Sequence, residues 1–93
     1  MKIKFTVKFK FLLEDQVRDI SRDKPIAATK FKKELLANLK KDLKYPFHYK
    51  KSVYSDDENV RDYVFKGYTI VFRFDAELES VLVVAILKHR NSF

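Results

Sequence analysis

The side chains best suited to acid–base or charge-stabilising chemistry lie near the C-terminus and in one run upstream of it. Lys88, His89 and Arg90 follow one another, and Arg61 and Arg73 stand earlier, in a stretch that alternates apolar and polar residues. A histidine can accept or donate a proton near neutral pH. Cationic groups can balance the negative charge that develops when a phosphodiester bond is attacked. Such chemistry requires these groups to converge on one face of the molecule.

Each of these residues also has a simpler interpretation. His89 is close to the last residue of the sequence, where a histidine is commonly solvated, and His48 lies in a polar stretch. Arg73 could pair with a carboxylate such as Asp62 or Asp75 and fix a strand in place. The basic run at the end could serve solubility alone. The sequence leaves both interpretations open.

Two tight hairpins organise the second half of the chain. From position 68 onward the alternation puts Tyr68, Ile70, Phe72 and Phe74 on one strand face and Thr69, Val71, Arg73 and Asp75 on the other. This pattern predicts a half-buried strand whose second face meets solvent. Gly67 permits the positive φ that a hairpin turn requires. A second hairpin leads into VLVVAIL, which is predicted to be the most buried of three antiparallel strands.

The N-terminal residues alternate strictly between apolar side chains and mostly lysine. The odd positions predict the buried face of a first strand, formed by Ile3, Phe5, Val7, Phe9 and Phe11. The other face would then present Lys2, Lys4, Lys8 and Lys10. This row of ammonium groups either discourages edge-to-edge pairing or binds a partner. A helical period replaces the alternation between Phe9 and Leu12.

Two amphipathic helices are predicted to follow. Their apolar stripes consist of Leu12, Leu13, Val17 and Ile20 in the first and Ala27, Ala28, Phe31, Leu35, Leu39 and Leu43 in the second. Asp23 is expected to cap the second helix, with Pro25 in its first turn, and Pro46 is expected to end it. A short extended piece is expected at residues 52–54. The predicted fold is α+β, in the order strand, helix, helix, strand, strand, strand, with an antiparallel sheet packed on a helical hairpin.

Composition limits the possible functions. The 93 residues make one domain, and 20 Lys and Arg against 13 Asp and Glu leave a net charge of +7. This balance favours a nucleic acid, a ribosome or an acidic protein segment as partner. The chain contains no cysteine and no long uncharged apolar run, so we expect a cytoplasmic protein without a membrane partner. The acidic run at 56–58 lacks the ligand spacing of a calcium loop, and we expect no metal or cofactor.

Four segments resemble the RelE/ParE superfamily of bacterial toxins from type II toxin–antitoxin modules. They are DKPIAATKFKKELLANL, the YP that follows it, the hairpin NVRDYVFKGYTIVFRFD, and the final VLVVAILKHRN. The hairpin is the most specific of them, and the likeness covers nearly the whole chain. It is closer to the ParE-like, plasmid-stabilisation branch. The resemblance implies a toxin that stops growth, is neutralised by a cognate antitoxin and forms a hetero-oligomer with it.

The resemblance also implies two kinds of target. ParE-like members bind a protein, which the resemblance suggests is DNA gyrase, whereas RelE-like members cleave mRNA on the ribosome. Nuclease members place two basic residues before the hairpin turn, an arginine after its Gly-Tyr, and a basic pair at the C-terminus, which Lys88, His89 and Arg90 match. Here the position after the Gly-Tyr is Thr69, and only Arg61 resembles the first pair.

We therefore expect a protein-binding toxin. An mRNA endonuclease using Arg61, Arg73, His89 and Arg90 is the first alternative, and a non-toxic binding domain is the second. The predicted target- or antitoxin-binding residues are Lys2, Lys4, Lys8, Arg61, Arg73, Lys88, His89 and Arg90.

Overall fold

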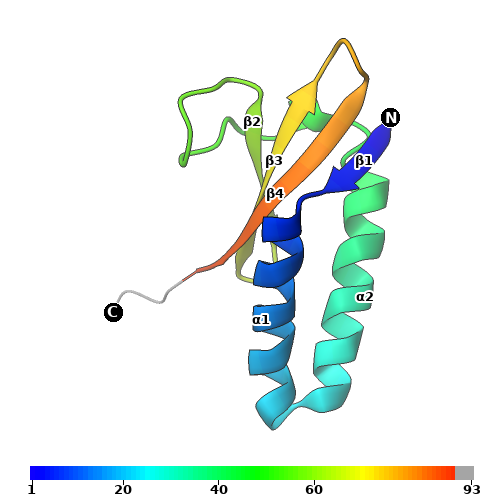
Figure 1. Ribbon diagram of the computed structural model, residues 1–93, viewed down its shortest axis with the longest axis vertical. Coiled ribbons are helices and arrows are strands. Elements are labelled where there is room, and N and C mark those ends of the chain that lie inside the picture. The colour runs from blue at the N-terminus through cyan, green and yellow to red at the C-terminus, as the bar shows by residue number, and fades with distance from the viewer. Residues whose placement is uncertain (90–93) are drawn as a thin grey trace.

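The computed structural model describes residues 1–89, which form a four-stranded sheet covered on one face by two helices (Figure 1). The elements are β1 (Lys2–Phe5), α1 (Val7–Asp23), α2 (Pro25–Asp42), the short 3₁₀ helix η1 (Pro46–His48), β2 (Val60–Phe65), β3 (Tyr68–Asp75) and β4 (Ser80–Lys88). The α+β class and the order of elements agree with the prediction. The sheet order is β1-β4-β3-β2. It is mixed, because β1 runs parallel to β4 while β2, β3 and β4 are antiparallel.

The first strand is shorter than predicted, and the change to helix comes earlier. Thr6 accepts a hydrogen bond from the Phe9 amide at 3.0 Å and so caps α1, while its own hydroxyl donates to the Val84 carbonyl at 3.2 Å. Val7 and Phe11 therefore lie on a helix and are 68% and 69% exposed, whereas Phe9 is fully buried. The predicted boundary between Phe9 and Leu12 was wrong. An alternating run of lysine and phenylalanine fits either period, and the N-cap decides between them.

The two helices form the predicted antiparallel hairpin and are joined by Lys24 alone. Asp23 is the last residue of α1, so it does not cap α2, but Pro25 does begin that helix. The second helix ends at Asp42, before Pro46 is reached. Its predicted stripe is buried except for Ala27, which is exposed. Apolar side chains from both helices then close the core over the sheet.

The strand β3 buries both of its faces over part of its length. Tyr68, Ile70, Phe72 and Phe74 face the helices as predicted, and all are at most 7% exposed. Thr69 and Val71 on the other face are each 5% exposed, so the expectation of a fully solvated second face was wrong. The loop before β2 folds over this side, where the Val53 amide donates to Asp62 Oδ2 at 3.2 Å. Arg73 and Asp75 remain exposed as predicted.

The β2–β3 turn and the preceding loop are fixed by local geometry. Lys66 and Gly67 take φ values of 48° and 82°, which suits a two-residue hairpin. The extended piece predicted at residues 52–54 is a single bridge one position earlier, between Lys51 and Arg61. This bridge adds a short fifth segment to the β2 edge. It holds the loop close to the sheet.

Candidate functional site

The two arginines of the predicted site lie on opposite faces of the sheet. Arg61 pairs in register with Phe72, which faces the helices, whereas Arg73 pairs with Val60 on the other face. The Arg61 guanidinium donates to the Glu58 carbonyl at 2.8 Å and to the Tyr49 carbonyl at 2.9 Å. Arg61 is thus engaged in holding the two ends of the loop before β2. The structure does not bring it together with Arg73.

Arg73 pairs with a carboxylate that the sequence did not indicate. Its Nη2 lies 3.5 Å from Asp57 Oδ2, and not beside Asp62 or Asp75. The two side chains are 59% and 38% exposed, so this ion pair contributes little stability. Arg73 also lines a hollow of about 290 Å³ with Lys4 and Leu82. In register, Lys4 of β1 lies beside Leu82 of β4, which lies beside Arg73 of β3.

His89 follows the last residue of β4, and its ring contacts the Thr69 hydroxyl. Thr69 and Arg73 share one face of β3, four residues apart, which corresponds to about 13 Å along a strand. Lys88 ends β4 and is exposed. Arg90 lies outside the described residues. Within residues 1–89, Arg61, Arg73 and His89 therefore do not converge around one point.

The predicted lysine row is divided between two elements. Lys2 and Lys4 lie on β1 and are exposed, as expected. Lys8 is also exposed, but it belongs to α1 and does not extend the sheet face. The physical reason is the helix that begins after Thr6, which rotates successive side chains by about 100° instead of alternating them.

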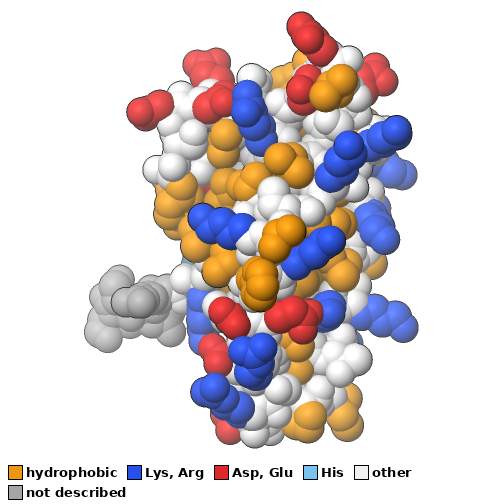
Figure 2. All heavy atoms as spheres, viewed as in Figure 1, with side chains coloured by type: hydrophobic (Ala, Val, Ile, Leu, Met, Phe, Trp, Pro, Cys, Tyr) orange, Lys and Arg blue, Asp and Glu red, His pale blue; other side chains and the backbone are white. Residues whose placement is uncertain are grey.

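An apolar groove between the two helices was missed by sequence reasoning. We call it the helix groove, and its volume is about 430 Å³. Its floor consists of Phe5, Phe9, Leu13 and Leu36. Its rim consists of Lys10, Lys32, Lys40 and Glu14. Lys32 Nζ reaches Glu14 Oε1 at 2.5 Å and links the two sides. On the face of the molecule drawn in Figure 2, apolar side chains lie among lysine and arginine side chains.

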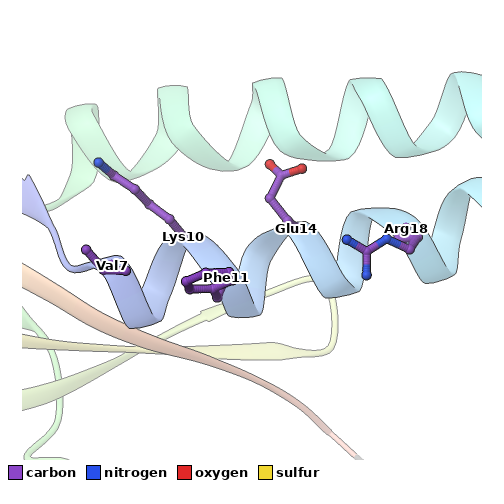
Figure 3. Close-up of a pocket in the computed structure, with 5 residues that line it drawn as sticks. All are labelled: Val7, Lys10, Phe11, Glu14 and Arg18. Carbon is purple, nitrogen blue, oxygen red and sulfur yellow. The ribbon is translucent and has the colours of Figure 1, made fainter.

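A smaller hollow of about 300 Å³ adjoins the helix groove on α1. Val7, Lys10, Phe11, Glu14 and Arg18 line it, and Figure 3 shows Lys10 and Glu14 pointing toward the neighbouring helix. The sequence feature that could have indicated this surface is the presence of apolar residues on two sides of the first turns of α1. Phe9 and Leu13 fill the core, while Val7 and Phe11 are left outside. This signal appears only once residues 7–11 are assigned to a helix.

Two further polar contacts fix the frame around these surfaces. Lys66 Nζ lies 2.7 Å from Glu34 Oε2, which ties the β2–β3 turn to α2, and this contact lowers the pKa of Glu34. Tyr63 donates to Asp42 Oδ2 at 2.5 Å. Burial raises the pKa of Tyr63, and this hydrogen bond raises it further.

Among residues 1–89, no three histidine or acidic side chains gather as a metal site. No helix described here is long and apolar enough to cross a membrane.

Comparison with known families decides the classification. The family model described as "ParE toxin of type II toxin-antitoxin system, parDE" matches residues 3–93. The chain belongs to this toxin family. The assignment to the RelE/ParE superfamily is thereby confirmed, as is its closer relation to ParE. A search of curated proteins finds no match.

Solved structures share the fold of this ParE-family chain. The chromosomal ParDE toxin–antitoxin system from P. aeruginosa aligns with a TM-score of 0.78 at 16% identity and covers 97% of each chain. The RelBE2 toxin–antitoxin complex from Mycobacterium tuberculosis aligns with a TM-score of 0.61 at 16% identity and covers 96% of each chain. At this identity the likeness shows the fold alone.

Proposed function

We propose that the chain is a growth-inhibiting toxin that acts by binding a protein target, and that this target is DNA gyrase. The observation that favours a protein-binding toxin over a ribonuclease is the separation of Arg61 from Arg73 by the sheet, together with the use of Arg61 to hold a loop. The choice of gyrase rests on the resemblance to ParE-like toxins. A ribonuclease needs its acid–base and charge-balancing groups around one phosphate. A protein-binding toxin has no such requirement. The family assignment supports toxicity.

The basic surface suits a target that is itself a protein. Lys4, Leu82 and Arg73 form a row across three strands, in which two cations flank an apolar side chain that is 38% exposed. Interfaces commonly combine an apolar centre with a charged rim. This row is the proposed target-binding surface. Lys88 pairs in register with Tyr68, so it lies on the helix side of the sheet and not beside the row. Binding through this surface requires no catalytic base.

The proposed antitoxin occupies the helix groove. Apolar floor residues and three rim lysines against one rim glutamate favour an acidic amphipathic segment, whose apolar side chains would enter the groove while its carboxylates meet the ammonium groups. The two solved structures named above are described as a toxin–antitoxin system and a toxin–antitoxin complex, which supports an antitoxin as partner. We infer that the protein encoded beside the toxin gene supplies this segment and neutralises the chain.

Two assays test the proposed target. Purified toxin is added to a gyrase supercoiling reaction and, separately, to a translating ribosome extract whose mRNA is mapped for breaks. We expect slowed supercoiling and uncut mRNA, and we expect His89→Ala to remain toxic. Codon-specific mRNA breaks that vanish in a His89→Ala/Arg90→Ala double variant would overturn the proposal and establish the endonuclease. If the protein shows neither activity and cells that express it grow normally, the chain is a non-toxic binding domain.

The antitoxin surface is tested by co-purification with the neighbouring gene product. Leu36→Glu places a charge on the partly buried groove floor and should abolish the complex, whereas Leu78→Glu, at a site that is 72% exposed in the β3–β4 turn, should leave it intact. Thermal melts of both variants check that each one folds. An intact complex with folded Leu36→Glu would place the antitoxin elsewhere.

A further inference from the structure

The segment between α2 and β2 carries a surface that neither proposed partner uses. Residues 43–55 read LKYPFHYKKSVYS and contain no acidic side chain. Lys44, Lys50 and Lys51 are all exposed. Tyr45 is 62% exposed and Phe47 is 64% exposed, although both are large rings that would ordinarily be covered. We call residues 44–51 the aromatic–lysine loop.

The exposed rings are held in fixed positions. Tyr45 stacks on His48 with ring centroids 5.4 Å apart and an interplanar angle of 16°. Phe47 sets its ring against Phe74 at 4.5 Å and 79°, an edge contact that anchors the ring to the sheet. The short helix η1 carries Phe47 and His48 as one rigid turn. The loop therefore presents ring surfaces without the cost of ordering them on binding.

Two further contacts make this arrangement rigid. The ring of Tyr49, at the end of the turn, makes edge contacts with the rings of Tyr63 and Phe72, with centroids 5.4 Å and 5.9 Å away. Arg61 holds the Tyr49 carbonyl, and its guanidinium lies 6.0 Å from the centre of the Phe47 ring. A guanidinium near an aromatic ring adds positive charge to the stacking surface.

Three carboxylates of neighbouring segments have contacts outside the aromatic–lysine loop. Asp42 accepts the Tyr63 hydroxyl, and Asp62 accepts the Val53 amide. Asp57 accepts the Asn59 amide at 2.8 Å and pairs with Arg73. Residues 44–51 themselves carry three lysines and no carboxylate.

We propose that the aromatic–lysine loop binds single-stranded nucleic acid. Unpaired bases would stack on Tyr45 and Phe47, and Lys44, Lys50 and Lys51 would contact the phosphates. Flat faces combined with backbone cations are the recurring basis of sequence-tolerant single-strand binding. A peptide of acidic residues alone would contact the lysines and leave the exposed rings of Tyr45 and Phe47 unused. This function is independent of the proposed gyrase target and of the helix groove.

Fluorescence anisotropy with labelled ten-nucleotide dT and rU strands tests the proposal on the full chain. Wild-type protein should bind both probes, and comparing the two affinities distinguishes DNA from RNA as the preferred strand. Tyr45→Ala/Phe47→Ala should weaken binding by about tenfold or more, because each stacked base contributes substantially. The matched control is Phe11→Ala, which removes a ring that is 69% exposed and adjacent to Lys10 on α1. It should bind as the wild type does.

The salt dependence of binding gives a second measurement, which does not depend on the ring variants. Lys50→Gln/Lys51→Gln should make the slope of log affinity against log salt shallower by about 1.4, since each phosphate contact on a single strand contributes about 0.7. Poly-glutamate of the same length serves as the acidic competitor. Unchanged affinity in the double ring variant would overturn the proposal. Poly-glutamate binding that is as tight as oligonucleotide binding, and that Lys50→Gln/Lys51→Gln weakens equally, would also overturn it and identify an acidic protein segment as the ligand of this loop.

Discussion

Tyr63 donates a hydrogen bond from its phenolic hydroxyl to Asp42 Oδ2 across 2.5 Å, which joins the middle of β2 to the last residue of α2. Burial and this hydrogen bond both raise the pKa of Tyr63. The folded protein therefore keeps the phenolic proton at pH values where the unfolded chain loses it. This contribution to stability is complete below about pH 10 and decreases as the pH rises beyond it.

The first prediction concerns alkaline stability. Tyr63→Phe should cost about 1 kcal/mol at neutral pH through the lost hydrogen bond, and it should flatten the loss of stability between about pH 10 and pH 12. Urea unfolding at several pH values measures both effects. Tyr45→Phe is the control, because Tyr45 is 62% exposed. An alkaline loss in Tyr63→Phe as steep as that of the wild type would mean that other groups cause it.

The second prediction concerns the two faces of β3. Phe72→Ala should cost about 3–5 kcal/mol, because the ring is fully buried under the helices. Val71→Ala should also be costly, at about 1–2 kcal/mol, since Val71 is only 5% exposed on the opposite face. Val64→Ala, on the same face at 65% exposure, should stay within about 0.5 kcal/mol. Denaturant melts that show equal losses for Val64 and Val71 would contradict the covered second face.

The third prediction tests the junction between β1 and α1. Thr6→Ala removes the helix cap and the contact with the Val84 carbonyl, and it should destabilise the fold by about 1–2 kcal/mol. Thr29→Ala is the matched change, because the Thr29 hydroxyl bonds only to Pro25 within the exposed side of α2. It should have little effect on the melting temperature. Equal shifts for the two variants would argue against Thr6 as the residue that ends the strand.

The fourth prediction concerns the rate at which the proposed antitoxin associates. Stopped-flow measurements should show the rate falling between about 0.05 and 0.5 M salt, since screening shortens the reach of the positive field. Reversing Lys10, Lys32 and Lys40 to glutamate should slow association and flatten this dependence. Changing Lys24, Lys33 and Lys41 to glutamate makes the same change in net charge away from the groove. This variant should keep more of the association rate and of its salt dependence. A salt-independent rate for the wild type would exclude electrostatic steering.

The fold was largely predictable because its periodic segments are long. The helical stripe that ends at Leu43 and the alternation from Tyr68 to Phe74 each repeat often enough to define an element. Residues 7–11 were misassigned because phenylalanine and lysine alternate there in a run that also fits a helix. Only the hydroxyl of Thr6, which acts on the Phe9 amide, separates the two cases.

The candidate site was less predictable, because its charges pair through tertiary contacts. Arg73 forms an ion pair with Asp57 of the loop before β2, and Arg61 binds two carbonyl groups of the same loop. Sequence spacing gives no information about either partner. The helix groove was missed for a related reason: it exists only where α1 and α2 lie side by side.

The parallel pairing of β1 with β4 has a consequence for synthesis of the toxin. β4 lies between β1 and β3, so the first strand to leave the ribosome has no neighbour until the last one follows it. The carbonyl that receives the Thr6 hydroxyl also belongs to β4. A nascent chain can therefore form its helical hairpin but cannot complete its sheet before residue 88 emerges. Premature termination within β4 leaves both halves of the sheet without their common strand, and such fragments should be degraded as unfolded polypeptides.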